Sequence, residues 1–140
     1  MIPTPPLRQI RIVILLTTAI FLSTASGCGN DPDVYQELFG TWVTHEEQYK
    51  DRYIIINNEL ITFGTGGEAP NLFFIETARK KENSGIRQYE FDCVNTEEAY
   101  FSFVFNVEEL KDQTILRLKN PHQVIWEKIS EAEKGSFALP

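Results

Sequence analysis

The sequence predicts an all-β fold: an up-and-down antiparallel meander of about eight strands that closes into a small barrel, preceded by one short helix. Two observations carry this prediction. Apolar and polar side chains alternate strictly along parts of the chain, most clearly over 99–107, and such alternation is typical of a sheet with one buried face. Turn-forming residues separate the apolar segments at short intervals, as expected for a series of hairpins.

A short helix is expected directly before the first strand. Asp31 suits the N-cap, Pro32 suits the first helical position, and Gly40 is a suitable stop. Between these residues, apolar side chains fall on one side of the predicted helix: Val34, Tyr35, Leu38 and Phe39.

Eight strands should follow, joined by turns such as Asn57-Asn58, Asn83-Ser84-Gly85 and Asn120-Pro121. Eight short antiparallel strands close most economically as a barrel. The segment 72–79 is the least regular, because four apolar residues follow one another in it. The expected strand ranges are 41–45, 52–57, 60–64, 72–79, 86–94, 99–107, 114–119 and 123–129.

Aromatic side chains dominate the face that this alternation turns inward. Eight strands give an interior that is either filled by side chains or holds one small ligand. Since each aromatic side chain buries about 150–250 Å², several of them predict a small or absent cavity rather than a lipid-sized one. Cys93 shares the face and is expected to be a buried small hydrophobe. The aromatic candidates for lining or filling the barrel are Tyr89, Phe91, Phe101, Phe103 and Phe105.

The first thirty residues predict export from the cytoplasm. Arg8 and Arg11 precede a short apolar run, Ile12 to Leu22, and small residues then lead to Cys28. No acidic residue occurs before Asp31. This order is typical of a secretory signal. The apolar run is also shorter than the roughly 20 residues that a transmembrane helix needs.

The segment Ala25-Ser26-Gly27-Cys28 resembles the lipobox of bacterial lipoprotein precursors. The resemblance implies diacylglyceryl transfer to the Cys28 sulfur, cleavage after Gly27, and a lipid-anchored protein of the cell envelope, outside the cytoplasm. Gly29, where an Asp would favour the inner membrane, points weakly to the outer one. The expected organisation is a signal peptide at 1–27, a lipidated tether at 28–31, a barrel domain at 32–130 and a flexible C-terminal tail at 131–140.

Charge and cysteine content exclude several kinds of partner. Removal of residues 1–27 takes away two Arg and no acid, so 11 basic and 20 acidic residues remain, a net charge of −9. Such a surface argues against nucleic-acid binding and against adhesion to anionic headgroups by anything except the lipid. With Cys28 lipidated, Cys93 has no partner for an internal disulfide.

The start of the meander, Leu38-Phe39-Gly40-Thr41-Trp42, resembles the lipocalin and wider calycin group. In that group a short helix leads into Gly-x-Trp on the first strand, and the Trp packs at the closed end of the barrel. A basic residue late in the last strand commonly covers this Trp. The resemblance therefore implies a closed end formed by Gly40, Trp42 and Lys128, and a ligand in the barrel.

At the other end, the loops 46–51, 64–71, 95–98 and 120–122 are expected to surround a mouth that faces away from the membrane. His45 and His122 fall near this mouth and are the only pair worth weighing as metal ligands. Neither an H-x-x-x-H nor an H-E-x-x-H spacing is present, so we expect no metal and a solvated acidic rim. The acidic residues of the rim are Glu46, Glu47, Asp51, Glu68, Glu97 and Glu98.

No motif in the sequence indicates catalysis. A G-x-S-x-G elbow is absent, and Gly64-Thr65-Gly66-Gly67 lacks the Lys-Ser/Thr of a phosphate loop. We therefore expect a non-enzymatic protein without a cofactor: an envelope lipoprotein that binds a small apolar or amphipathic ligand. The alternative is an interaction protein whose acidic rim binds an envelope protein or enzyme over a filled core.

Overall fold

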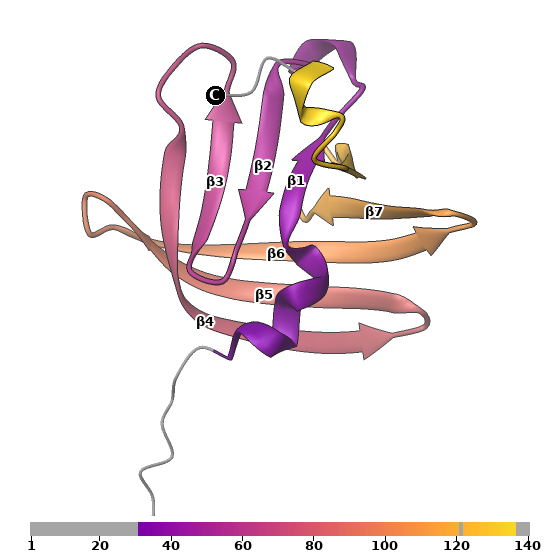
Figure 1. The fold of residues 1–140 in the computed structure, drawn as a ribbon. Helices are drawn as coiled ribbons and strands as arrows, with labels where there is room; N and C mark the ends of the chain where they lie inside the picture. Colours follow the sequence, from indigo (N-terminus) through magenta and orange to yellow (C-terminus); the bar gives the residue numbers. More distant parts are fainter. Residues whose placement is uncertain (1–30, 121, 137–140) are drawn as a thin grey trace, which may run out of the picture.

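The predicted eight-stranded antiparallel barrel is confirmed by the computed structural model, which describes residues 31–120 and 122–136. Each strand pairs with its sequence neighbours, and β1 pairs with β8 to close the barrel (Figure 1). The predicted signal peptide and lipobox lie outside the described residues. The strands are β1 (Gly40–Val43), β2 (Arg52–Ile56), β3 (Leu60–Thr65), β4 (Asn71–Asn83), β5 (Ile86–Asn95), β6 (Tyr100–Leu110), β7 (Gln113–Leu118) and β8 (Ile125–Ile129).

Three short 3₁₀ helices accompany the strands: η1 (Pro32–Leu38), η2 (Glu47–Tyr49) and η3 (Lys134–Ser136). The predicted N-cap is confirmed, since the Asp31 side chain accepts a hydrogen bond from the Asp33 backbone N–H at 3.1 Å. Tyr35 and Leu38 bury the apolar side of η1 against the barrel. Sequence reasoning missed η2, which starts four residues after β1 ends, where the first strand was expected to run to residue 45.

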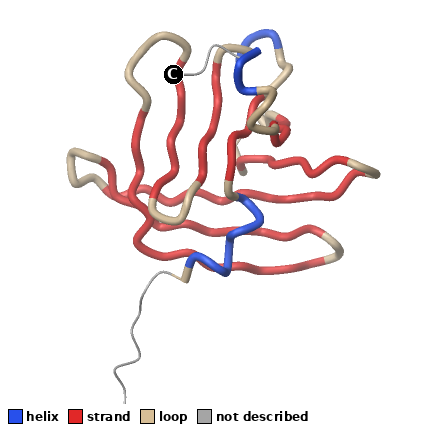
Figure 2. Tube along the Cα trace, viewed as in Figure 1, coloured by secondary structure: helices blue, strands red, loops and turns tan. Residues whose placement is uncertain are grey.

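The strands cross as two layers rather than running parallel around a cylinder. In Figures 1 and 2, β1, β2 and β3 run across the direction of β5, β6 and β7, and β4 bends to join both groups. The bend coincides with a register shift between Ile75 and Thr77, where one extra residue interrupts the pairing with β5. Phe73 and Ile75 pack on the core before this bulge and Ala78 after it. The bulge explains why 72–79 showed no simple alternation.

Two strands run well past the ends that the sequence predicted. β4 runs to Asn83 and β6 to Leu110, where 79 and 107 were expected. The extra residues of β4 pair with β5 through the hairpin at Ser84 and Gly85. Their side chains are mostly polar and exposed, so the apolar pattern ended before the backbone pairing did.

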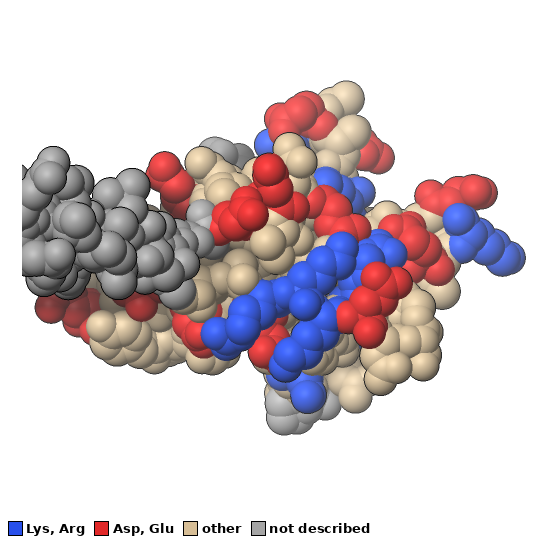
Figure 3. All heavy atoms as spheres, turned by 90° about the horizontal axis from the view of Figure 1, so that it is seen from below, with Lys and Arg blue, Asp and Glu red and all other residues tan. Residues whose placement is uncertain are grey.

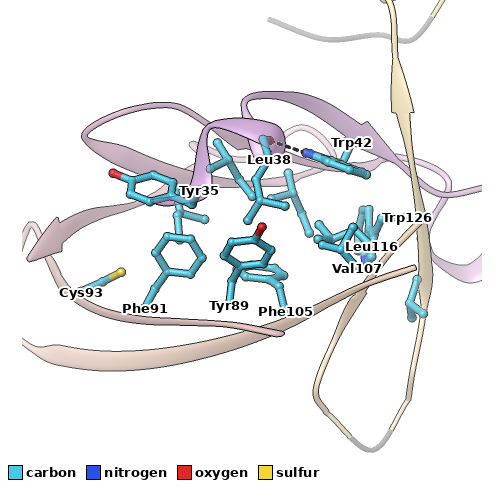
Figure 4. Packing of buried hydrophobic residues seen from close by; sticks show 14 residues of the cluster. Tyr35, Leu38, Trp42, Tyr89, Phe91, Cys93, Phe105, Val107, Leu116 and Trp126 are labelled. Carbon is cyan, nitrogen blue, oxygen red and sulfur yellow. Dashed lines mark hydrogen bonds between the residues drawn. The ribbon is translucent and has the colours of Figure 1, made fainter. Parts of the chain in front are cut away.

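Side chains fill the interior beside η1. Figure 4 shows Tyr89, Phe91 and Phe105 reaching toward Tyr35 and Leu38, and all five are fully buried. The Phe91 ring lies 5.0 Å from the Tyr35 ring and 5.8 Å from the Phe105 ring, both in edge-to-face geometry, which favours aromatic pairs. This part of the barrel is therefore a packed core.

One candidate for the interior was wrong. Phe101 is 40% exposed, and Phe103 is only partly buried. The alternation placed both on the correct face, since their rings stack 6.3 Å apart against Phe73. However, the pairing of β6 with β7 begins only at Phe105. The earlier part of β6 extends beyond its neighbour, and Phe101 is left at the surface.

Cys93 is a fully buried free cysteine on β5. Burial is the main cause that raises the pKa of its thiol to about 12, and the charges of Asp92 and Glu76 add to the effect. The thiolate, which is the reactive form, is therefore scarce at neutral pH.

We expect Cys93 to react slowly with thiol reagents in the folded protein, because it is both shielded and protonated. The measurement is labelling with a chromogenic disulfide at pH 8, with and without denaturant, on protein whose Cys28 is blocked by lipid. Rapid, stoichiometric labelling without denaturant would contradict the burial of this side chain.

Candidate functional site

The closed end of the barrel joins η1 to the first and last strands. The Trp42 indole N–H donates to the Leu38 carbonyl oxygen at 2.9 Å, a contact drawn in Figure 4. The Lys128 ammonium lies 5.6 Å from the Trp42 ring centroid and donates to the Glu37 carbonyl at 3.0 Å. Burial lowers the pKa of Lys128. These contacts hold η1 across the end of the barrel.

Gly40 allows this close approach. Its φ of +133° lies in the region that favours glycine. A Cβ at this position would lie 2.8 Å from the Lys128 Cε. The three residues of the expected closed end, Gly40, Trp42 and Lys128, therefore meet in the structure.

Trp42 and Lys128, together with η1, form a plug at the closed end of the barrel. Outside this plug, the Glu37 carboxylate forms a polar network. It accepts hydrogen bonds from the Tyr89 hydroxyl, from Arg87 Nε at 3.0 Å and from Lys80 Nζ at 3.3 Å. Arg87 also donates to Glu109 at 2.7 Å, and this bond is the main cause that raises the pKa of Arg87. The network ties η1 to the two long strands β4 and β5.

The basic residues near this end form a band in Figure 3, with acidic residues along its edges. Four of them contact carboxylates within ion-pair distance: Arg79, Lys80, Lys81 and Arg87. Lys81 donates to Glu90 at 2.7 Å and is the main cause of the lowered pKa of that carboxyl. This band is therefore largely neutralised by its own acidic neighbours.

The pKa of Asp92 is also lowered, mainly by hydrogen bonds from Ser102 and Thr77 and less by Arg79. A carboxyl whose folded pKa lies below its ordinary value stabilises the fold above that ordinary value. The contribution is lost as the pH falls through the ordinary and then the folded pKa. Glu90 and Asp92 thus make the barrel less stable in acid.

A pocket opens at the opposite end of the barrel, with a volume of about 280 Å³. This volume lies near the lower limit of small-ligand pockets. It is the strongest candidate for a binding site, because barrel mouths are a common place for such sites. The lining residues come from β2, β3, β4, β7, β8 and the two loops beside them: Tyr49, Arg52, Tyr53, Phe63, Gly64, Asn71, Leu118, Asn120, His122, Val124 and Trp126.

The pocket is amphipathic. Val124 and Trp126 are only 5% and 7% exposed, and Phe63 and Leu118 are partly buried against the core. Polar side chains of Arg52, Asn71 and His122 are exposed on the same pocket. An apolar ligand portion would therefore pack on the buried residues, with a polar portion near the solvent.

Local interactions shape the loops beside the pocket. Tyr49 lies on η2, and the centroid of its ring is 6.4 Å from that of the His122 ring. The side-chain oxygen of Asn120 accepts hydrogen bonds from the backbone N–H groups of His122 and Gln123, at 3.1 and 3.0 Å. Such Asx turns fix a loop locally, so the entrance is built by residues close together in sequence.

Arg52 is distinctive among these residues. Its guanidinium carbon lies 5.0 Å from the Tyr49 ring centroid. Among the residues that the structure describes, no carboxylate forms an ion pair with it. The neighbouring Asp51 carboxylate lies instead against the backbone of Gly66, on the loop across the mouth.

The two histidines have different neighbours. His45 Nε2 lies 3.3 Å from a Glu127 carboxylate oxygen, whereas His122 packs beside Tyr49. Within residues 31–120 and 122–136, no three His, Cys, Asp or Glu side chains are close enough together to hold a metal ion.

The expected single acidic rim is wrong in one respect. Figure 1 shows the loop between β5 and β6 at a different corner from the loops that flank the pocket. That loop carries Glu97 and Glu98. The crossing of the strand layers separates these two acids from Glu47, Asp51 and Glu68.

The sequence-based candidates and the pocket residues differ. None of the five aromatic residues expected to line the barrel lines this pocket. Arg52 could have been predicted as a pocket residue, because it has the same two-residue spacing as the inward-facing Ile54 and Ile56. Tyr49 could not have been predicted in this way, because it belongs to η2, which is too short to produce a periodic sequence pattern.

Fold and pocket together define a small closed antiparallel barrel with one plugged end and an amphipathic pocket at the other. A comparison with protein families, with curated proteins and with solved structures finds no match. In the described part of the chain, no helix is long and apolar enough to cross a membrane. The proposals below therefore rest on this chain's own residues.

Proposed function

We propose that this protein is a lipid-anchored binding module of the bacterial cell envelope, which holds a small amphipathic ligand in the mouth pocket. The observation that carries the proposal is the pocket of about 280 Å³ above a filled interior. Its buried apolar residues and exposed polar ones match the usual composition of ligand sites. The calycin-like plug formed by Trp42 and Lys128 supports the comparison with barrels that bind ligands at their open end.

The anchoring part of the proposal rests on Arg8 and Arg11, the short apolar run and Cys28. Asp31, where the described chain begins, is three residues after Cys28. Three extended residues span at most about 10–11 Å, so a lipid on Cys28 keeps the barrel close to the membrane surface. At least two acyl chains are needed for a stable anchor.

Replacing Cys28 with Ser is expected to abolish lipid attachment, since the hydroxyl does not form the thioether. The measurement is metabolic labelling with a palmitate analogue, together with fractionation of membranes. The matched control is Cys93→Ala, which removes the other cysteine and should leave labelling intact. Persistent labelling of the Cys28→Ser protein would overturn the anchor.

Ligand binding is tested by uptake of small probes into the detergent-solubilised protein. We expect wild type to bind neutral aromatic probes of benzyl size and to reject long acyl chains, because the interior below the pocket is filled. Native mass spectrometry of freshly extracted protein should identify the natural occupant. Absence of binding by any apolar probe would contradict a binding module.

If no apolar probe binds, the second candidate function, an interaction protein, gains support. The observation that favours it is the charge around the mouth, where Glu47, Asp51 and Glu68 are all exposed in a protein of mature net charge −9. A basic surface on an envelope protein would be its partner. Reversal of these three charges should then abolish co-purification of that partner.

A further inference from the structure

We propose that the ligand of the mouth pocket is a small monocarboxylate with an aromatic or compact branched body, and that Arg52 binds its carboxylate. This inference rests on the proposed function and names the chemical class that the pocket selects. Three observations carry it: a guanidinium with no carboxylate partner among the described residues, the apolar residues beside it, and the limited volume.

The first observation is the position of Arg52. The protein is strongly acidic, yet the Arg52 guanidinium has no carboxylate partner among the described residues. By comparison, Arg79, Arg87 and Arg117 all contact acidic side chains. The guanidinium lies over the Tyr49 ring, which leaves its N–H groups available at the pocket. A planar guanidinium binds a carboxylate through two parallel hydrogen bonds.

The second observation concerns the sign and size of the ligand charge. A cationic ligand would be repelled by Arg52. A phosphate dianion would meet one Arg or Lys side chain among the described lining residues, with the exposed Asp51 carboxylate next to it in sequence. A single negative charge therefore suits this site better than either a cation or a dianion.

The third observation concerns the body of the ligand. Phe63, Leu118 and Trp126 supply apolar contacts beside Arg52, so an aromatic or branched group packs there while the carboxylate stays near the guanidinium. The pocket volume of about 280 Å³ limits this body to one ring or a few branched carbons. Phe91 and Phe105 are fully buried in the interior, so a long chain would have to displace them to enter the barrel.

The test is calorimetric titration of the full chain in detergent with phenylacetate, neutral phenylacetamide, 2-phenylethylammonium and dodecanoate. Phenylacetate should bind at least about tenfold more tightly than its neutral isostere, the usual effect of one charge-assisted pair. The ammonium probe and dodecanoate should bind more weakly still. The indole N–H resonance of Trp126 reports whether each probe occupies the pocket.

Arg52→Gln should remove the preference for phenylacetate over phenylacetamide and leave the affinity for the neutral probe within about twofold, because the apolar contacts remain. Arg52→Lys should restore part of the preference, since it keeps the charge without the planar fork. The matched control is Arg117→Gln, which removes a guanidinium paired with Glu108 and should change neither affinity.

Equal binding of the acid and the amide by wild type, or an unchanged preference in Arg52→Gln, would overturn this inference but leave the proposed function standing. Tightest binding by the ammonium probe would do the same. Failure of every probe to bind or to shift the Trp126 resonance would overturn both.

Discussion

Replacing Trp42 with alanine is expected to lower the free energy of unfolding by about 3–5 kcal/mol, the usual cost of deleting a large buried aromatic side chain. Trp42 is fully buried, so its removal leaves a cavity at the closed end. It also leaves the Leu38 carbonyl without its 2.9 Å partner and Lys128 without the ring beneath it. Folded domains are stable by only about 5–15 kcal/mol, so the variant should be close to unfolding.

The measurement is equilibrium denaturation of wild type and Trp42→Ala, followed by circular dichroism. Trp42→Phe separates the two contributions, because it keeps an aromatic ring but loses the indole N–H. Its expected cost is the smaller one of an unsatisfied buried carbonyl, about 1–3 kcal/mol. If Trp42→Ala melts like wild type, the plug does not support the barrel, and the comparison with calycins loses its main structural basis.

Phe105→Ala should lower the free energy of unfolding by a similar amount, about 3–5 kcal/mol. The reason differs, because Phe105 lies inside the barrel, where its ring packs against Phe91 and Phe103. The cavity left by the ring is apolar and should stay dry, which makes it a site for a benzene-sized probe. In wild type, the Phe105 ring occupies this space within the cluster of buried residues.

Xenon or benzene binding, followed by chemical shifts of residues around Phe91, tests the second part of this expectation. Phe103→Ala is the matched control, because Phe103 is only partly buried and its removal opens space toward solvent. It should cost less stability and create no enclosed site. Equal costs for the two variants would contradict the distinction between a packed interior and a solvent-accessible margin.

Alternation in the sequence predicted side-chain direction better than it predicted burial. Tyr89, Phe91, Cys93 and Phe105 are all inside, as their spacing indicated. Phe101 follows the same spacing and is exposed, because burial also depends on whether a neighbouring strand covers that part of the sheet. Strand pairing across the barrel is a property of the whole chain and is not visible within one segment.

The pocket was less predictable than the core for a related reason. Its residues come from strands and loops that meet only after closure, and each contributes at most three side chains. Tyr49 reaches the pocket from a three-residue helix that has no periodicity to detect. By contrast, the contacts at the closed end could be predicted from the Gly40-Thr41-Trp42 segment. Most of these contacts join residues that are close together in sequence, such as Leu38 and Trp42, and one distant residue, Lys128, completes them.

The seam between β1 and β8, where Trp42 lies opposite Lys128, is the strand pairing of longest range in sequence among the described residues. Such contacts form late, because the entropy of closing a long loop opposes them. Until this seam forms, β1 and β8 have open edges that can pair with other chains. Trp126 lies on the strand that completes the seam and also lines the pocket, so the pocket does not exist in the open form. A ligand of the proposed kind would therefore bind only the closed barrel and stabilise it by mass action. Occupancy of the pocket and protection from aggregation would then be parts of one linked equilibrium.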